Sequence, residues 1–228
     1  INSGLWSFFF AFLLVLIYMV FYYKRAGWVA NIALIANVFF IIGTLASLGA
    51  ALTLPGIAGL VLTIGMSVDA NVLIYERIRE ELRNGKGIKL AIQDGYKHAY
   101  SAIIDANVTS LLTAVVLAYF GSGPIQGFAT TLIIGVFTSL FSAIFITRLI
   151  FSYLLDTKRE VYFSRKFTEN LFTGTTIQFL KKRKIFYVFS SLIIGYGIFS
   201  LSTRGLDGGV EFTGGRTYRV EFSQKIDK

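Results

Sequence analysis

Cysteine is absent from the 228 residues, and histidine occurs once, at His98. Without cysteine the chain has no disulfide framework, no thiolate metal ligand and no cysteine nucleophile. One histidine also excludes a site built from several histidines within this chain. A Walker phosphate-binding motif is missing as well, which argues against direct use of ATP. We therefore expect no catalytic residues, no metal site and no enzymatic activity.

Charged residues are also scarce, at 15% of the chain compared with about 25% in a typical soluble domain. Hydrophobic residues make up 54%, and the mean hydropathy is +0.64. The net charge of +9 raises the question of nucleic-acid binding. No basic stretch is interleaved with aromatic residues as in a nucleic-acid-binding module. The basic residues are instead typical of membrane-protein loops that contact anionic lipid headgroups, so we expect a lipid bilayer as partner and no nucleic acid.

Six apolar segments are long enough to cross a bilayer, whose core of about 30 Å needs about 20 helical residues. They run approximately over Leu5–Tyr23, Trp28–Leu52, Pro55–Tyr75, Tyr100–Phe120, Ile125–Leu155 and Ile185–Thr203. Two of the connections are so short that they must join antiparallel neighbours. Glycines within the segments favour close helix packing, namely Gly43, Gly65, Gly135 and Gly195. The sequence predicts an all-α polytopic membrane protein of about six transmembrane helices.

Basic residues predict the orientation of these helices. They gather in three connections, which we place in the cytoplasm because positive charge marks that side of the membrane: 24–27, 76–97 and 156–184. The short connections on the other side contain no basic residue. The tail, 204–228, is then extracytoplasmic.

The segments outside the spans have patterns of their own. Glu76 and Arg77 are expected to anchor the third span at the interface. Ile88–Gln93 is amphipathic and predicts a short helix lying along the membrane surface. Thr217–Phe222 alternates as a β-strand does, after a glycine-rich stretch. The tail therefore predicts the start of a small extracytoplasmic α+β domain.

Of the 13 acidic residues, only Asp69 and Asp105 fall within the hydrocarbon on these assignments. A carboxylate at mid-helix costs on the order of 2.5–3.5 kcal/mol. Asp69 lies seven residues before Glu76, and Asp105 lies eight residues after Lys97. At 1.5 Å per residue, both are roughly 10–12 Å inside the cytoplasmic edge. The two carboxyls are thus expected at equal depth, buried in adjacent helices.

Both aspartates begin the same tripeptide, Asp69-Ala70-Asn71 and Asp105-Ala106-Asn107. Two facing carboxyls in a low dielectric favour a shared proton, and asparagine can hydrogen-bond across helices. We predict a proton pathway comprising Asp69, Asp105, Asn71 and Asn107. A hydrogen-bonded clamp that only fixes helix packing is the alternative. An intramembrane aspartyl protease is disfavoured because neither aspartate has the flanking residues of that class.

Several motifs resemble those of the SecD and SecF families. Residues 54–59 read LPGIAG, 68–74 read VDANVLI and 121–129 read GSGPIQGFA, all similar to SecD. Residues 206–215 read LDGGVEFTGG, similar to the segment after the first SecF helix. The resemblance to SecD covers about residues 5–155.

This resemblance implies the fused SecDF form and a bundle of the resistance-nodulation-division (RND) type. Its expected layout is SecD-like helices in 1–155, a cytoplasmic linker in 156–184, a SecF-like helix in 185–203 and the start of a SecF domain in 204–228. The family implies residence in the bacterial plasma (inner) membrane and the partners SecYEG, YajC and YidC. It also implies use of the proton-motive force to assist preprotein export.

Within that family, Asp69 corresponds to the proton-carrying aspartate, and protons rather than a bound cofactor are the coupling agent. The matching groups of the SecF half are expected beyond Lys228. Two other functions stay open at this point. One is an RND-type exporter of lipids or small molecules, and the other is a purely structural partner of a channel.

Overall fold

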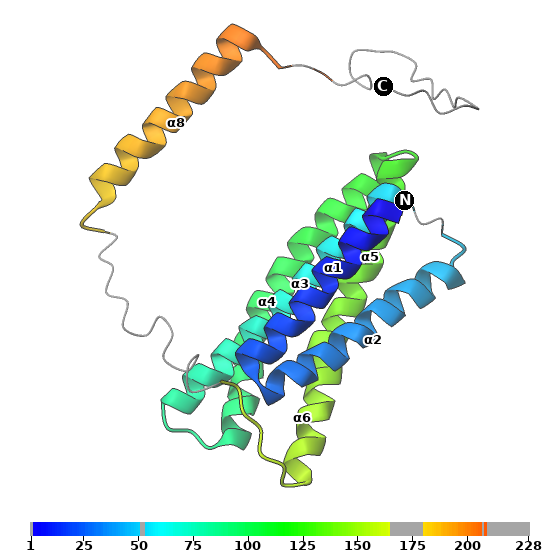
Figure 1. The fold of residues 1–228 in the computed structure, drawn as a ribbon, viewed down its shortest axis with the longest axis vertical. Helices are drawn as coiled ribbons and strands as arrows, with labels where there is room; N and C mark the ends of the chain where they lie inside the picture. Colours follow the sequence, from blue (N-terminus) through cyan, green and yellow to red (C-terminus); the bar gives the residue numbers. More distant parts are fainter. Residues whose placement is uncertain (1, 51–52, 165–179, 207, 209–228) are drawn as a thin grey trace, which may run out of the picture. The chain divides into compact units, whose positions relative to one another are not determined.

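The computed structural model describes residues 2–50, 53–164, 180–206 and 208. The chain divides into two compact units, 1–173 and 174–228. The described residues of the first unit form α1 (Asn2–Tyr23), α2 (Arg25–Ser47), α3 (Leu54–Arg83), α4 (Ile88–Phe120), α5 (Pro124–Leu140), the π-helix η1 (Phe141–Ile146) and α6 (Thr147–Asp156). The second unit contributes α8 (Arg183–Arg204). No strand occurs among the described residues, which confirms the all-α prediction (Figure 1).

Every predicted span overlaps a helix, although α2 ends at Ser47, before the predicted end of the second span at Leu52. Among the described residues, five helices are long and apolar enough to cross a membrane; α5, η1 and α6 count as one continuous helix, Pro124–Asp156. The described apolar part of α1 is the shorter stretch Phe9–Tyr23. Figure 1 shows α1, α3, α4 and α5 side by side, with α2 running at an angle to them, and α3 packs against α4, α5, α1 and α2. The predicted strand at 217–222 and the domain containing it lie outside the described residues.

The ends of α3 follow from local chemistry. Thr53 caps its first turn, where the Gly56 N–H donates to Thr53 Oγ1 at 3.1 Å, and Pro55 occupies the position where a missing N–H is harmless. The helix ends at Arg83, and Gly85 turns the chain with a φ of 84°. Thirty residues span about 45 Å, so α3 extends well beyond a bilayer core of about 30 Å.

The prediction of a separate surface helix at Ile88–Gln93 is wrong. These residues form the first turns of α4, which continues without a break to Phe120. The apolar face of this segment packs on α3, where Ala91 is fully buried and Gly95 lies against Ile78. A Cβ at Gly95 would be 2.4 Å from Ile78 Cγ1. The apolar residues of Ile88–Gln93, which predicted contact with the membrane surface, pack against another helix instead.

A π-helical stretch interrupts the last helix of the bundle. Phe141–Ile146 forms η1, between α5 and α6. The buried residues Ser139, Ala143, Thr147 and Phe151 recur every four positions through it. This spacing exceeds the 3.6 residues of an α-turn, as expected where a π-turn widens the helix. The bulge keeps one face of α5 and α6 against the other helices.

The chain after α6 returns to the α1–α2 turn. The Ala26 N–H donates to the Tyr162 carbonyl at 3.1 Å, and the Lys24 ammonium lies 4.2 Å from the centre of the Tyr162 ring. Phe163 is 2% exposed and packs edge-on against Tyr75, with ring centres 5.4 Å apart. The start of the predicted linker is therefore part of the hydrophobic core.

Two of the glycines that the sequence singled out are not at close helix contacts, and other glycines are. A Cβ at Gly135 would be 2.2 Å from Thr63 Cγ2, as the sequence predicted. Gly43 and Gly65 have open space around them, so the expectation is wrong there. The tightest approach is at Gly27, where a Cβ would be 2.1 Å from the Met19 carbonyl oxygen. Gly27 thus allows α1 and α2 to meet next to the turn that joins them.

Candidate proton-pathway site

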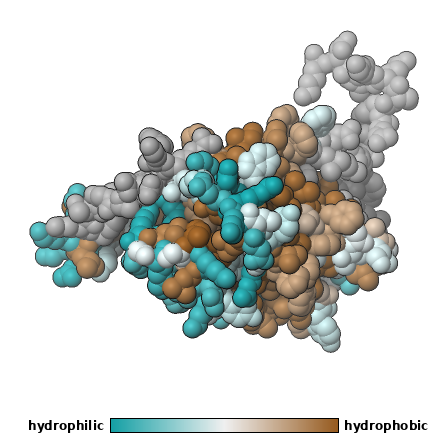
Figure 2. Space-filling model, turned by 90° about the horizontal axis from the view of Figure 1, so that it is seen from below, coloured by the Kyte–Doolittle hydropathy of each residue, from teal (hydrophilic) through white to brown (hydrophobic). Residues whose placement is uncertain are grey.

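The predicted cytoplasmic end of the bundle carries a polar network that links α1 to α3. Glu76 Oε1 accepts from the Tyr23 hydroxyl at 3.0 Å and from Arg79 Nη1 at 2.6 Å. The Arg79 side chain is 4% exposed. Figure 2, seen from this end, shows hydrophilic side chains gathered across it. Glu76 therefore does more than anchor the helix at an interface, whereas Arg77 forms an exposed pair with Glu80 at 2.7 Å.

The turn between α3 and α4 is closed by ion pairs around Lys86. Its ammonium lies 2.6 Å from Asp94 and 2.7 Å from Glu81, which also lies 3.0 Å from His98 Nδ1. The hydrogen bonds with Asp94 and Glu81 raise the pKa of Lys86. The hydrogen bond from Lys86 lowers the pKa of Asp94 in turn.

Replacing Lys86 with alanine should loosen this turn. We expect faster hydrogen–deuterium exchange in residues 84–97 at pH 7, and no change when the exposed Lys89 is replaced instead. Because the pKa of Asp94 is lowered, its ion pair stabilises the turn at pH values above the ordinary carboxyl pKa of about 4. Because the pKa of Lys86 is raised, the pair stabilises the turn at pH values below the ordinary lysine pKa of about 10.4. Protection in the wild type should therefore fall in acid and in strong base. Equal exchange in both variants would contradict this role.

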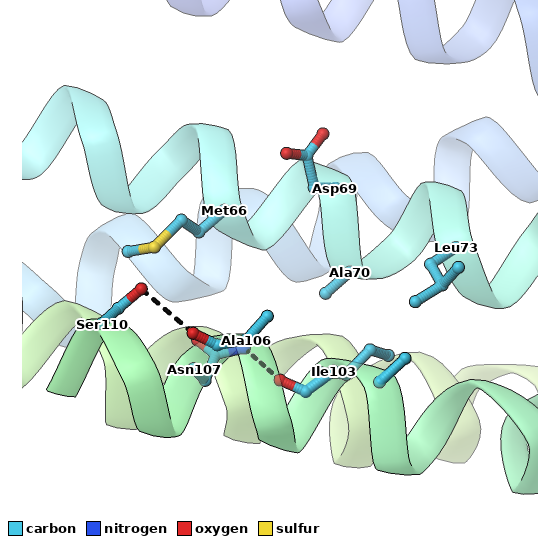
Figure 3. A pocket seen from close by; sticks show the side chains of 9 residues that line it. Met66, Asp69, Ala70, Leu73, Ile103, Ala106, Asn107 and Ser110 are labelled. Atoms are coloured by element: carbon cyan, nitrogen blue, oxygen red, sulfur yellow. Dashed lines mark hydrogen bonds between the residues drawn. The ribbon is translucent and has the colours of Figure 1, made fainter. Parts of the chain in front are cut away.

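Asp69 lies on α3 at the edge of a cavity between α3 and α4. The cavity has a volume of about 180 Å³. Figure 3 shows the carboxylate at its rim, pointing away from α4, with Asn107 and Ser110 on the facing helix. Within the described part of the chain, the Asp69 carboxylate makes no ion pair or side-chain hydrogen bond, and it is exposed on the protein surface.

Asp105 is exposed as well and does not line this cavity. Residues two apart on a helix point about 200° apart, so Asp105 faces nearly opposite to Asn107. The expected burial and face-to-face arrangement of the two carboxyls are therefore not found. The sequence indicates depth in the bilayer, but it does not indicate which face of each helix meets other helices.

The two asparagines are buried, with Asn71 1% and Asn107 6% exposed. Each amide nitrogen donates to a carbonyl four residues back in its own helix, Asn71 to Ser67 at 3.1 Å and Asn107 to Ile103 at 2.8 Å. Both Oδ1 atoms have no partner among the described residues. A buried acceptor without a donor costs about 1–3 kcal/mol, so both positions favour a water molecule or another proton donor.

Other buried polar side-chain atoms also have no hydrogen-bond partner among the described residues. Within the described residues they include both amide atoms of Asn37 on α2, Ser67 Oγ on α3 and Ser142 Oγ in η1. Asn37 and Ser67 stand out in the sequence as polar residues within apolar spans. Ser142 does not, because a single serine in an apolar segment usually bonds to its own helix. The bundle interior thus contains more hydrogen-bonding capacity than its own atoms use.

The fold and this site define a multi-pass membrane protein with an ionisable residue inside a membrane-spanning helix. The family model of the protein export membrane protein SecD/SecF, C-terminal, matches residues 1–157, and that of the SecD/SecF GG motif matches residues 199–226. The chain belongs to the SecD/SecF family.

Curated relatives and solved structures agree with this assignment. Protein translocase subunit SecD of Rhodothermus marinus is 59% identical over 155 residues, which is 68% of this chain and 25% of that protein. SecD of Haemophilus influenzae is 51% identical over 160 residues, 70% of this chain and 25% of that protein. The crystal structure of SecDF from Thermus thermophilus, a translocon-associated membrane protein, matches with a TM-score of 0.85 and 35% identity over 94% of this chain and 29% of that one. This chain therefore spans about a quarter of the length of these relatives.

Proposed function

We propose that the full-length protein containing this chain is an auxiliary subunit of the Sec protein translocase, driven by the proton-motive force. It would assist preprotein export across the bacterial inner membrane. The observation that carries the proposal is Asp69, a carboxyl on a membrane-spanning helix that has no ion pair among the described residues. The names of the relatives, protein translocase subunit SecD and SecDF, support the assignment to translocation rather than to export of lipids or small molecules.

In this proposal Asp69 carries the proton. A carboxylate in a bilayer is costly when charged and far less costly when neutral, so taking up a proton changes the environment that the residue prefers. The adjoining cavity of about 180 Å³ has room for several water molecules, which could deliver the proton. Asn107 lines the cavity and has a free acceptor atom. Charging and neutralising Asp69 would then bias the packing of α3 between two arrangements.

Asn71 and Asp105 have supporting roles in the proposal. Asn71 lies two residues from Asp69 with an unused buried acceptor. Asp105 is exposed on a different face of α4, so it would serve a separate step of the pathway, at another helix contact. The proposed partners are the SecYEG channel, YajC, YidC and the preprotein. In the proposed orientation, residues 24–27, 76–97 and 156–184 are cytoplasmic, and residues 204–228 are extracytoplasmic.

The test compares inner-membrane vesicles with and without the full-length protein. Preprotein export is measured with the proton gradient intact and after a protonophore has collapsed it, and SecYEG is sought among copurifying proteins. We expect copurification and a contribution to export that disappears with the gradient. A contribution of equal size without a gradient would support a purely structural partner of the channel instead.

A further inference from the structure

A second cavity lies between α3, α4, η1 and α6, nearer the predicted cytoplasmic end than the cavity at Asp69. Its volume is about 370 Å³. Lys97 and Tyr100 line it from α4, Arg148 lines it from α6, and Ile144 contributes from η1. It shares only Ile103 with the cavity at Asp69. None of its charged residues belongs to the proposed proton pathway.

Two positive charges face this cavity, and no acidic residue lines it. Lys97 and Arg148 are both exposed, and neither forms an ion pair within the part of the chain that the structure describes. The acid nearest to Lys97 along α4 is Asp94, which is held by Lys86 at 2.6 Å. The lining of the cavity therefore carries a net positive charge, which favours an anion.

The walls that hold the two cations are fixed by a buried contact. The Tyr96 hydroxyl and Thr147 Oγ1 lie 2.5 Å apart and join α4 to α6. Tyr96 precedes Lys97 and Thr147 precedes Arg148, so this contact sets the positions from which both basic side chains extend. Tyr96 is 8% exposed and Thr147 is fully buried. The pair of cations thus stands on a rigid support rather than on a loop.

The remaining lining is apolar on the inside and amphipathic at the rim. Ile74 is 1% and Ile103 3% exposed, and both line the cavity on its inner side. Tyr100, 54% exposed, and Gln93 stand near the predicted membrane surface. Tyrosine is enriched at the depth of lipid headgroups, and long basic side chains there extend toward the phosphate layer. Cations above an apolar floor match a phosphate group attached to an acyl chain.

We propose that this cavity binds the headgroup phosphate of an anionic phospholipid, with Lys97 and Arg148 as its ligands. Basic pockets between helices on the cytoplasmic side are suited to such headgroups. The apolar floor favours a lipid over inorganic phosphate, which has nothing to place there. Bound lipid would bridge α4 and α6 outside the proton pathway.

The test is native mass spectrometry of the full-length protein in detergent, titrated with phosphatidylglycerol, phosphatidylcholine or inorganic phosphate. The double variant K97Q/R148Q is compared with K89Q/R159Q, which removes one lysine and one arginine from exposed positions outside the cavity. Each basic side chain near anionic lipid is worth about fivefold in affinity, so we expect about a thirty-fold loss of phosphatidylglycerol binding in K97Q/R148Q. The control should stay close to the wild type.

Preferential binding of phosphatidylglycerol over phosphatidylcholine, lost in the cavity variant alone, supports the proposal. Equal losses in both double variants would overturn it, because any surface charge would then suffice. Displacement of the lipid by millimolar inorganic phosphate would also overturn it, since the site would then recognise a free anion. The variant K97R/R148K, which keeps both charges, should retain binding; failure to do so would contradict a role of charge.

Discussion

Asp69→Asn in the full-length protein should abolish the part of preprotein export that depends on the proton gradient. Export should fall to the level of membranes lacking the protein, because asparagine fills the same space but cannot take up and release a proton. The measurement is export into vesicles with the gradient intact. Asp105→Asn should reduce export less. Asp105 faces away from the side of α4 that carries Asn107, and it does not line the cavity at Asp69.

The matched control is Asp156→Asn, the same chemical change at an exposed carboxyl at the end of α6. It should export as the wild type does. Expression and association with the channel must be normal in all three variants. Full export by Asp69→Asn would contradict the role of this carboxyl as the proton carrier.

Gly27→Ala should destabilise the bundle. The added methyl would lie 2.1 Å from the Met19 carbonyl oxygen and 2.8 Å from the Val20 Cα. These are backbone atoms, so α1 and α2 must move apart at the turn that joins them. Overpacking of this kind costs about 1–3 kcal/mol. The thermal unfolding midpoint of the purified full-length protein should therefore fall.

Gly43→Ala is the matched control on the same helix, because its Cβ would meet no atom within 4 Å. Alanine is favoured over glycine in a helix by about 0.5–1 kcal/mol, so this variant should be neutral or slightly more stable. A loss of stability in Gly27→Ala without a loss in Gly43→Ala would establish the close approach of α1 and α2. A fall of the same size in both would contradict it.

The helices could be predicted from the sequence because apolar runs of bilayer length and short turns leave few alternatives. Pro55 with Thr53 marks the start of α3, and Gly85 marks the turn after it. Contacts between distant residues were harder to predict. The hydrophobic face at Ile88–Gln93 fits a membrane surface as well as a neighbouring helix, and only the close approach at Gly95 distinguishes them.

The sequence predicts how deep in the bilayer the two aspartates lie, but not which face of its helix each one occupies. Counting residues from the charged ends places Asp69 and Asp105 at similar levels in the bilayer. The face that each presents depends on which stripe of α3 and α4 packs inward, where the buried Asn71 and Asn107 lie. The hydrogen bond between Tyr23 and Glu76 joins residues 53 positions apart, and no local pattern indicates it.

The most direct test of Asp69 as proton carrier is proton influx into proteoliposomes that contain the full-length protein and the SecYEG channel. A pH-sensitive dye in the lumen reports influx under an imposed gradient while preprotein is translocated. The account predicts influx coupled to translocation in the wild type and in Asp156→Asn, and none above background in Asp69→Asn. Equal influx in Asp69→Asn would contradict it.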